Sequence, residues 1–265
     1  MKKKYIILSI RALVLLAAVT WVIWGNTTVG LNTIIVQEKN LPSAFDGYRI
    51  AHVSDLHNSW LWEQAIKQLQ KAQPDIICIT GDMVDANRTD IDIALAFAAE
   101  AVKIAPCYYV TGNHETALTM AEFAELTDGL SALGVCVLDD EEVFLTKGDA
   151  IVSLVGHSWG LTDRIAELTD FGGYSILLSH QPEDFSNYVA AQYDLVLSGH
   201  AHGGQFRIPF LGGLYAPGQG IFPGYDGGLY TMGETDMVVS RGIGNSSFPI
   251  RFNNQPEVVL IILEA

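Results

Sequence analysis

The sequence predicts an α/β fold in which two sheets pack against each other in a layered sandwich. Five apolar runs rich in Ile, Val, Leu and Tyr indicate buried strands. Helical segments separate the strands through residue 110, whereas closely spaced strands follow from 134 to 155 and again after residue 202. Strand and helix alternation followed by β-rich stretches is typical of such a sandwich rather than of a barrel.

The amino terminus differs from the rest of the chain. A cluster of three lysines at residues 2–4 precedes an acid-free apolar stretch from Tyr5 to Trp24 that only Arg11 interrupts. Twenty such residues match the ~30 Å hydrocarbon thickness of a bilayer. The thirteen uninterrupted residues after Arg11 would also suit the apolar part of a signal peptide. Because no clear small-residue cleavage site follows and Trp21 lies near the far end, we expect an uncleaved signal anchor.

This interpretation divides the chain into an anchor at residues 1–27 and a domain at residues 28–265. The lysine cluster should stay in the cytoplasm and leave the domain on the other side of the membrane. If the segment is instead a signal peptide that is removed, the domain is secreted. Either interpretation exports the domain.

Length and charge limit the functions that the domain at residues 28–265 can have. A chain of 265 residues that is 49% hydrophobic can form one sizeable core. The anchor holds four of the 15 basic residues and none of the 30 acidic ones, so the remainder carries a net charge of −19. Such a domain should not bind long nucleic acids electrostatically. An anionic substrate would need a local positive centre, which bound metal ions supply.

The remaining elements follow from periodicity and end signals. We expect helices at 60–72, 90–103, about 117–132 and 183–191, the second preceded by a capping box of Thr89 and Asp92. We expect strands at 135–140, 141–147 and 149–156, then in DMVVSRG and PEVVLIILEA. The odd number of cysteines without short spacings indicates buried apolar residues rather than disulfides or a zinc knuckle; these are Cys78, Cys107 and Cys136.

Each of the five apolar runs ends on side chains that can bind a metal. These candidate ligands are Asp55, His57, Asp82, Asn113, His180, His200 and His202. Asp, Asn and His are also ordinary residues of turns, so one such strand end would mean little. Because ligands of open α/β sheets collect beyond the carboxyl ends of the strands, the repetition predicts one shared site. We expect His52 to pack in the core or on the other face of its strand, and His157 to lie outside the site.

The ligand types indicate the chemistry. Carboxylate, imidazole and amide oxygen suit divalent ions such as Mn, Fe or Zn, and nothing in the sequence selects among them. Asp55 and His57 are two positions apart, so in an extended segment both would project to one side, and His200 and His202 repeat this spacing. With Asp82 as a bridge, the site could hold two ions ~3.5–4 Å apart, and a shared water would become the attacking hydroxide.

The motifs DLH, GDMVD, GNHE, LLSH and GHAHGG, in this order, resemble those of the calcineurin-like metallophosphoesterases over about residues 48–263. The closing pattern SRGIGNSSFPIRFNNQPEVVLIIL resembles the membrane-associated or exported bacterial branch, the YaeI/YkuE-like subgroup. The resemblance implies a four-layer α/β/β/α sandwich with a dinuclear site at its edge. One ion would take Asp55, His57, Asp82 and His202. The other would take Asp82, Asn113, His180 and His200.

The resemblance also implies a general acid. His114 follows a ligand and would lie near the leaving oxygen, with Glu115 as its orienting partner. The alternative is that His114 only packs against its loop. Asp85 would stabilise its own loop rather than bind a metal.

We therefore expect a metal-dependent phosphoester hydrolase. Phosphodiesters, including lipid-linked or nucleotide-linked ones, are favoured because the anchor keeps the site near the bilayer. The alternatives are a broad-specificity phosphomonoesterase and a non-catalytic scaffold with the same fold, while the acidic domain disfavours a nuclease. The oligomeric state stays open.

A long segment rich in Gly, Pro and aromatic residues, 203–228, is expected to form an irregular flap that influences substrate choice. Its aromatic residues would line an amphiphilic cleft or face the lipid surface; they are Phe206, Phe210, Tyr215, Phe222 and Tyr225. Trp60 and Trp62 follow the first ligand loop, where at least one should pack in the core. Arg207 and Arg241 could contact a substrate phosphate or have structural roles.

Overall fold

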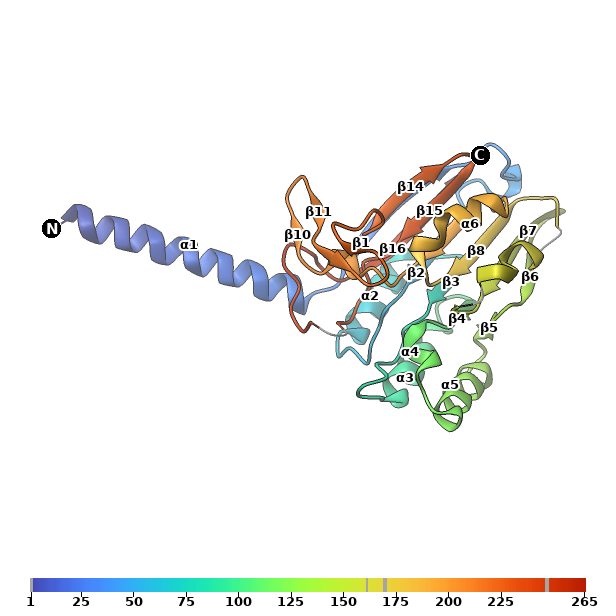
Figure 1. Ribbon diagram of the computed structural model, residues 1–265, viewed down its shortest axis with the longest axis horizontal. Helices are drawn as coiled ribbons and strands as arrows, with labels where there is room; N and C mark the ends of the chain where they lie inside the picture. Colours follow the sequence, from blue (N-terminus) through green and yellow to red (C-terminus); the bar gives the residue numbers. More distant parts are fainter. Residues whose placement is uncertain (1, 161, 169–170, 246–247) are drawn as a thin grey trace.

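The computed structural model describes residues 2–160, 162–168, 171–245 and 248–265. Its first element, α1 (Lys2–Thr27), projects from the domain as a single helix (Figure 1). The stretch Lys4–Thr27 is long and apolar enough to cross a membrane, and none of it is buried against the domain. At 1.5 Å per residue its 24 residues extend about 36 Å, which exceeds the hydrocarbon thickness of a bilayer. The helix therefore fits the anchor that the sequence predicts.

One six-stranded sheet has the order β1-β16-β2-β3-β4-β5. The strands are β1 (Gly30–Gln37), β16 (Glu257–Glu264), β2 (Arg49–Val53), β3 (Ile76–Thr80), β4 (Cys107–Val110) and β5 (Cys136–Val137). All neighbours are parallel except β16 and β2. The helices that cover its outer face are α2 (Trp62–Ala72), α3 (Ile91–Ala101) and α5 (Met120–Ala132). Leu69, Phe97 and Leu126 from these helices share one apolar cluster with Ile77 and Ile79 of β3.

The second six-stranded sheet has the order β14-β15-β9-β8-β7-β6. The strands are β14 (Gly228–Met232), β15 (Thr235–Val239), β9 (Leu195–Ser198), β8 (Ser175–Ser179), β7 (Ala150–His157) and β6 (Glu142–Lys147). Its outer face packs on α6 (Phe185–Ala190) and on the 3₁₀ helix Thr162–Glu167.

The two sheets bury a second apolar cluster between them. Ile76 and Cys78 of β3 contribute to it together with Ile176 and Leu178 of β8. Because side chains alternate along a strand, β3 presents Ile77 and Ile79 to the helices. Its other two apolar side chains, those of Ile76 and Cys78, face the second sheet. The result is the four-layer α/β/β/α sandwich that the sequence predicts.

The Gly-rich segment is less irregular than expected. It begins with the 3₁₀ helix His202–Gly204 and then forms two short hairpins. Their strands are β10 (Arg207–Ile208), β11 (Gly212–Gly213), β12 (Tyr215–Ala216) and β13 (Gly220–Ile221). Other short elements are α4 (Asn113–Thr116) and the 3₁₀ helices Ser43–Phe45 and Pro182–Asp184.

Some local expectations were wrong. The helix α3 begins after Asp90, which makes no capping side-chain bond, so Thr89 and Asp92 do not form the predicted capping box. A capping box occurs instead at α5, where the Thr119 hydroxyl accepts from the Glu122 N–H and the Glu122 carboxylate accepts from the Thr119 N–H. The helix expected near 117–132 is α5, which begins at Met120 and follows the separate short helix α4, whereas the strand expected at 135–140 is reduced to β5.

The cysteines are free. Cys78 and Cys107 are buried as predicted, whereas Cys136 is only half-buried because it lies in the short edge strand β5.

Candidate metal centre

The strands β2, β3 and β4 of one sheet and β8 and β9 of the other end at a common edge, where their loops contact one another. The Asp55 N–H donates to the Gly81 carbonyl at 3.1 Å, and the His57 N–H donates to the Asp82 carbonyl at 3.0 Å. Across the sheets, the His200 N–H lies 3.2 Å from the Asp55 carboxylate. The structure thereby brings together all seven candidate ligands. Six are buried and Asn113 is half-buried.

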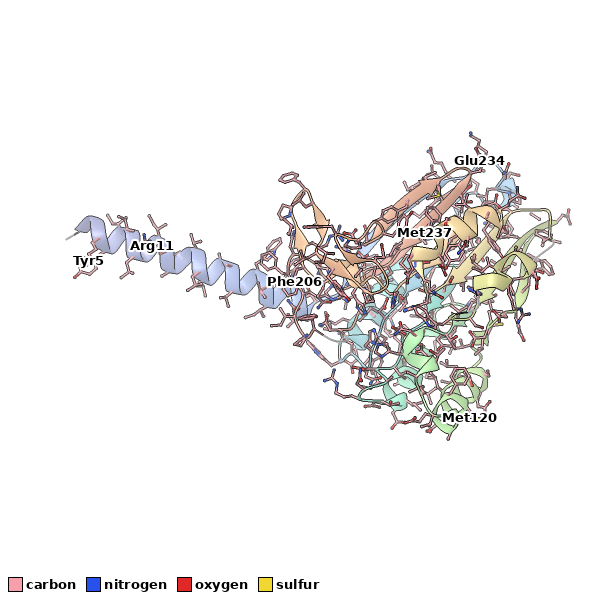
Figure 2. All side chains as sticks on the ribbon, in the orientation of Figure 1. Tyr5, Arg11, Met120, Phe206, Glu234 and Met237 are labelled. Atoms are coloured by element: carbon pink, nitrogen blue, oxygen red, sulfur yellow. The ribbon has the colours of Figure 1, made fainter. Side chains whose placement is uncertain are left out.

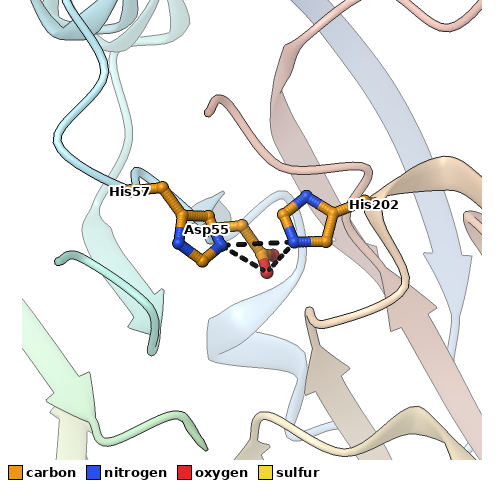
Figure 3. A group of neighbouring side chains, drawn as sticks. All are labelled: Asp55, His57 and His202. Atoms are coloured by element: carbon orange, nitrogen blue, oxygen red, sulfur yellow. Dashed lines mark hydrogen bonds and ion pairs between the residues drawn. The ribbon is translucent and has the colours of Figure 1, made fainter. Parts of the chain in front are cut away.

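One group of donors comprises Asp55, His57 and His202 (Figure 3). Asp55 Oδ1 lies 3.8 Å from His57 Nε2 and 3.4 Å from His202 Nε2. The two Nε2 atoms are 3.2 Å apart. Three ligand atoms thus face one point.

A second group comprises Asp82, His180 and His200, and a third, which overlaps both, comprises His57, Asp82 and His114. Asp82 Oδ2 lies 3.2 Å from His180 Nε2 and also 3.5 Å from His57 Nε2. Asp82 therefore lies between the two groups, where a bridging carboxylate would have to be.

The donors do not project from extended backbone as expected. Five of them have left-handed backbone conformations: Asp55 (φ 53°), His57 (φ 45°), Asp82 (φ 52°), His200 (φ 66°) and His202 (φ 47°). For residues other than glycine this conformation costs about 1–2 kcal/mol each, so the surrounding fold must maintain it. Glycines make room for the bends, because a Cβ at Gly112 would collide with Asp82 and one at Gly199 with Ser54.

The charges at this edge are arranged to hold cations. Burial alone would raise the pKa of both carboxyl groups, but His202 and His57 beside Asp55, and His180 and His57 beside Asp82, hold each pKa well below its usual range. Burial alone would lower the pKa of His180, yet Asp82 and Asp55 raise it to about 10.

The neighbouring carboxylates also raise the pKa of His57 against the effect of its burial, whereas the imidazoles of His200 and His202 suit metal binding because they stay neutral. Burial lowers the pKa of His200 to about 4 and that of His202 to about 3. A neutral imidazole has a free lone pair on one ring nitrogen, as a metal ligand requires.

The donor set fits divalent ions by its own geometry. His180 Nδ1 donates to the Thr80 carbonyl at 2.6 Å, so Nε2 is the ring nitrogen that would bind an ion, once the ion displaces the proton held there by the raised pKa. That Nε2 faces Asp82 Oδ2, and neither atom has a hydrogen-bond partner. The buried Asn113 Oδ1 also lacks one. Buried acceptors that face one another are costly unless a cation lies between them.

The structure corrects the role expected for Glu115. Its carboxylate accepts hydrogen bonds from the N–H groups of Asp82, Met83 and Gly112, each at 2.8 Å. Burial raises the pKa of Glu115 to about 7. Glu115 thus fixes the loops that present Asp82 and Asn113, because loop amides that face inward need an acceptor.

The ring of His114 has other neighbours. Its Nδ1 accepts from the Ala86 N–H at 3.0 Å and lies 3.6 Å from Asp85 Oδ1. Because Nδ1 is an acceptor there, the ring proton is on Nε2. Burial lowers the pKa of His114, so the neutral ring is an Nε2–H donor.

Asp85 and the remaining histidines take the places expected. Asp85 Oδ1 accepts from the Asn87 N–H at 3.0 Å and so stabilises its loop. His52 is buried inside β2, with Nε2 2.8 Å from the Thr80 hydroxyl. His157 lies outside the donor groups, 3.4 Å from Asp140 Oδ1.

Sequence reasoning missed three residues beside the donors. The ring centroid of Trp159 lies 4.9 Å from that of His200, and Glu183 Oε1 lies 4.0 Å from His200 Nε2. Trp159 follows β7, so the same strand-end argument could have found it. Arg251 is buried with Nη2 3.5 Å from His202 Nδ1, and it donates to the carbonyls of Arg241 and Gly244. No sequence signal pointed to Arg251.

A cavity of about 210 Å³ opens onto the donors. It is lined by Asp82, Asn113, His114, His200, His202, Gln205, Tyr215, Pro217 and Phe248. Of the predicted aromatic residues, Tyr215 lines this cavity. Tyr225 instead packs against Phe185 and Tyr230, and Phe206 packs against Phe248.

The arginines and tryptophans also have defined places. Arg207 pairs with Asp226 at 3.1 Å and Arg241 pairs with Glu257, so both have structural roles. Trp62 packs against the helix-side core, whereas Trp60 is exposed.

Comparison with known proteins agrees with this geometry. The family model described as calcineurin-like phosphoesterase matches residues 48–204, which include all seven donors. The uncharacterized metallophosphoesterase YkoQ of Bacillus subtilis is 30% identical over 263 residues, and the match covers 96% of this chain and 97% of YkoQ.

Two further similarities concern activity and fold. The phosphodiesterase YaeI of Escherichia coli is 28% identical over 229 residues, with 82% of each chain covered. The crystal structure of TT1561 of Thermus thermophilus superposes with a TM-score of 0.51 at 12% identity, over 74% of this chain and 89% of that one. At this identity the structural likeness supports the fold alone.

Proposed function

Because the chain belongs to the calcineurin-like phosphoesterase family, we propose that it is a phosphodiesterase that uses two divalent ions held by the seven donors. Family membership makes it a metal-dependent phosphoester hydrolase. The observation that carries the finer proposal is the position of Asp82, which lies between two groups of buried donors.

The donors divide between two ions. Asp55, His57, Asp82 and His202 would hold one, and Asp82, Asn113, His180 and His200 the other. When bound, ions at these positions stabilise charge on the phosphoryl oxygens and lower the pKa of an attacking water. Mn, Fe and Zn all suit carboxylate, imidazole and amide donors.

The chain supplies a hydrogen-bond donor for the leaving group. His114 borders the cavity, and the Ala86 N–H fixes its ring with the proton on Nε2. His114 would donate a hydrogen bond from this N–H to the departing oxygen and stabilise the charge that develops there, since an unassisted alkoxide is a poor leaving group. Glu115 acts indirectly, because it holds the backbone beside Asp82 and Gly112.

The anchor supports a substrate at the membrane. We propose that α1 spans the bilayer with its lysine cluster in the cytoplasm, so that the domain at residues 28–265 lies on the extracytoplasmic side. A cavity held there would meet lipid-linked or nucleotide-linked phosphodiesters. The domain has a net charge of −19, which does not favour nucleic acid.

The test is to purify the full chain in detergent and to measure bound metals by mass spectrometry. Rates on bis-(p-nitrophenyl) phosphate and p-nitrophenyl phosphate are then compared. We expect about two ions per chain and a higher kcat/KM for the diester. A higher value for the monoester would indicate a phosphomonoesterase. Two bound ions without turnover on a broad panel of phosphoesters would indicate a scaffold.

A further inference from the structure

Exposed apolar side chains lie on two segments that are hydrogen-bonded to each other and to the C-terminal end of α1. We call them the apolar collar: Ile208, Phe210 and Leu211 from the β10–β11 hairpin, and Phe248, Ile250 and Phe252 from the segment before β16. All six are exposed. Large contiguous apolar surfaces are uncommon on water-soluble faces and indicate an interaction site.

Hydrogen bonds tie the collar to the end of the membrane helix. The Asn26 side-chain amide donates to the Arg251 carbonyl at 2.8 Å and accepts from the Arg251 N–H at 2.7 Å. The Arg207 N–H donates to the Phe252 carbonyl at 2.9 Å, which joins the hairpin to the same segment. Figure 1 shows β10 and β11 beside the C-terminal end of α1. A bilayer crossed by α1 would therefore reach the collar.

The backbone of the hairpin gives no folding reason for its aromatic residue. Phe210 has φ +70° and is fully exposed, and Phe222 in the next hairpin combines φ +53° with exposure. Left-handed positions favour Gly or Asn and disfavour bulky side chains. An exposed phenylalanine that strains its own backbone gains nothing from folding, so an external partner is the reason for it.

Charge indicates which partner this face fits. The chain has 30 acidic residues, yet none lies between 195 and 225 or between 237 and 256, the two segments that carry the collar. Of the basic residues there, Arg207 is paired with Asp226, Arg241 with Glu257, and Arg251 is buried. A face without acids can approach anionic lipid headgroups, whereas the rest of the domain would be repelled.

We infer that the apolar collar inserts into the bilayer interface as a second membrane contact and turns the cavity toward the lipid. Phe248 belongs both to the collar and to the cavity wall, and Tyr215 lines the same wall. The cavity mouth thus lies at the lipid surface. The substrate class that follows is a phosphodiester carried by an amphiphile, and this part rests on the proposed function.

The membrane contact itself is tested without catalysis. The full chain with Cys136→Ala receives a nitroxide label through Phe210→Cys or, as a control, Met120→Cys. Met120 is exposed on α5, away from α1 (Figure 2). In vesicles of phosphatidylcholine and phosphatidylglycerol, we expect the label at 210 to be at least about threefold more accessible to oxygen than to a water-soluble nickel chelate, relative to the label at 120. Equal ratios of oxygen to nickel accessibility at positions 210 and 120 would show that the collar does not enter the bilayer.

The consequence for the substrate is tested by kinetics. The collar variant combines Phe210→Asn, which suits the left-handed backbone at that position, with Leu211→Ser, and it leaves the cavity lining intact. The control, Met120→Ser with Phe144→Thr, removes two exposed apolar residues elsewhere. We expect the collar variant to lose about 5–10-fold in rate on a diacylglycerol p-nitrophenyl phosphodiester embedded in vesicles. Its rate on soluble bis-(p-nitrophenyl) phosphate should stay within twofold, and the control should change neither rate.

An equal loss on both substrates would overturn this role of the collar. A wild-type chain inactive on both substrates would overturn the proposed function instead, and the nitroxide measurement would still decide the membrane contact.

Discussion

Asp82 and Glu38 are buried carboxyl groups at opposite ends of the sandwich, and their pKa values shift in opposite directions. At the donor end, the imidazoles of His180 and His57 hold the pKa of Asp82 below its usual range. Glu38 lies at the far end, where its N–H donates to the Glu264 carbonyl at the end of β16. Burial there raises the pKa of Glu38, and neighbouring carboxylates, among them Asp236, add to this effect. The resulting pKa is about 7.

The comparison shows that burial does not decide what a carboxyl group does. Burial raises the pKa at both ends, and the neighbours determine the outcome. Imidazoles around Asp82 favour its charged form and therefore a cation beside it. Burial and the carboxylates around Glu38, among them Asp236, favour a bound proton, and the hydrogen bond with the Tyr174 hydroxyl opposes them only in part. One end is suited to metal chemistry and the other to a neutral, structural role.

The largest expected effect is that of Asp82→Asn. An amide cannot bridge two cations as a carboxylate does, so the chain should lose several kcal/mol of transition-state stabilisation, or on the order of 10³-fold in kcat/KM or more. Metal analysis should show fewer than two ions per chain. The matched control is Glu38→Gln, the same chemical change at the far end, which should keep both activity and metal. Equal losses in the two variants would contradict the comparison.

His114→Ala should have the next largest effect. Without a hydrogen-bond donor to the leaving oxygen, the rate on a diester with an alkyl leaving group should fall about 10²–10⁴-fold. The rate on bis-(p-nitrophenyl) phosphate should fall much less, because p-nitrophenolate leaves without a proton. Metal content should be unchanged. A uniform loss on both substrates would show that His114 positions the loop instead.

Removal of the metals should lower stability at the donor end. Ions at 100 to 1,000 times their Kd stabilise the native state by about 3–4 kcal/mol. Urea unfolding of the full chain in detergent, with and without a chelator, measures this difference. Asp82→Asn should abolish most of it, whereas Glu38→Gln should retain it. A chelator effect that is the same in both variants would place the bound ions elsewhere.

The smallest effect is the pH dependence due to Glu38. Its pKa in the folded chain, about 7, lies above the value of 4.5 that is usual for an exposed glutamate. Its contribution to the free energy of unfolding is therefore fully present below pH 4.5 and is lost as the pH rises toward 7. After solvent screening we expect roughly 1 kcal/mol over this window. Urea unfolding of the chelator-treated chain should show a flatter profile for Glu38→Gln, and an unchanged profile would show that Glu38 is already ionised.

The sequence was sufficient for the architecture and for the meeting of the donors. Strand ends of parallel units must lie at one edge, so His180 and Asp82 could be placed together from their positions after β8 and β3. The sequence did not predict the left-handed backbone at Asp55, because Asp is common in turns whether the backbone is right-handed or left-handed. It also did not indicate that Glu115 binds the amides of Asp82 and Met83, because that loop lies more than 30 residues earlier in the chain and contacts of that range leave no local pattern.

The two hydrogen bonds between Asn26 and the Arg251 backbone make the cutting point of the anchor consequential. The Arg251 side chain lies 3.5 Å from His202 Nδ1, so Asn26 at the end of α1 is linked to a candidate metal ligand through a single residue. A released form that begins at Thr28 lacks Asn26 and leaves both Arg251 backbone groups to water, whereas one that begins at Gly25 keeps them paired. Two truncated chains whose first residues lie three positions apart would therefore differ in how firmly the backbone of Arg251 is held behind His202.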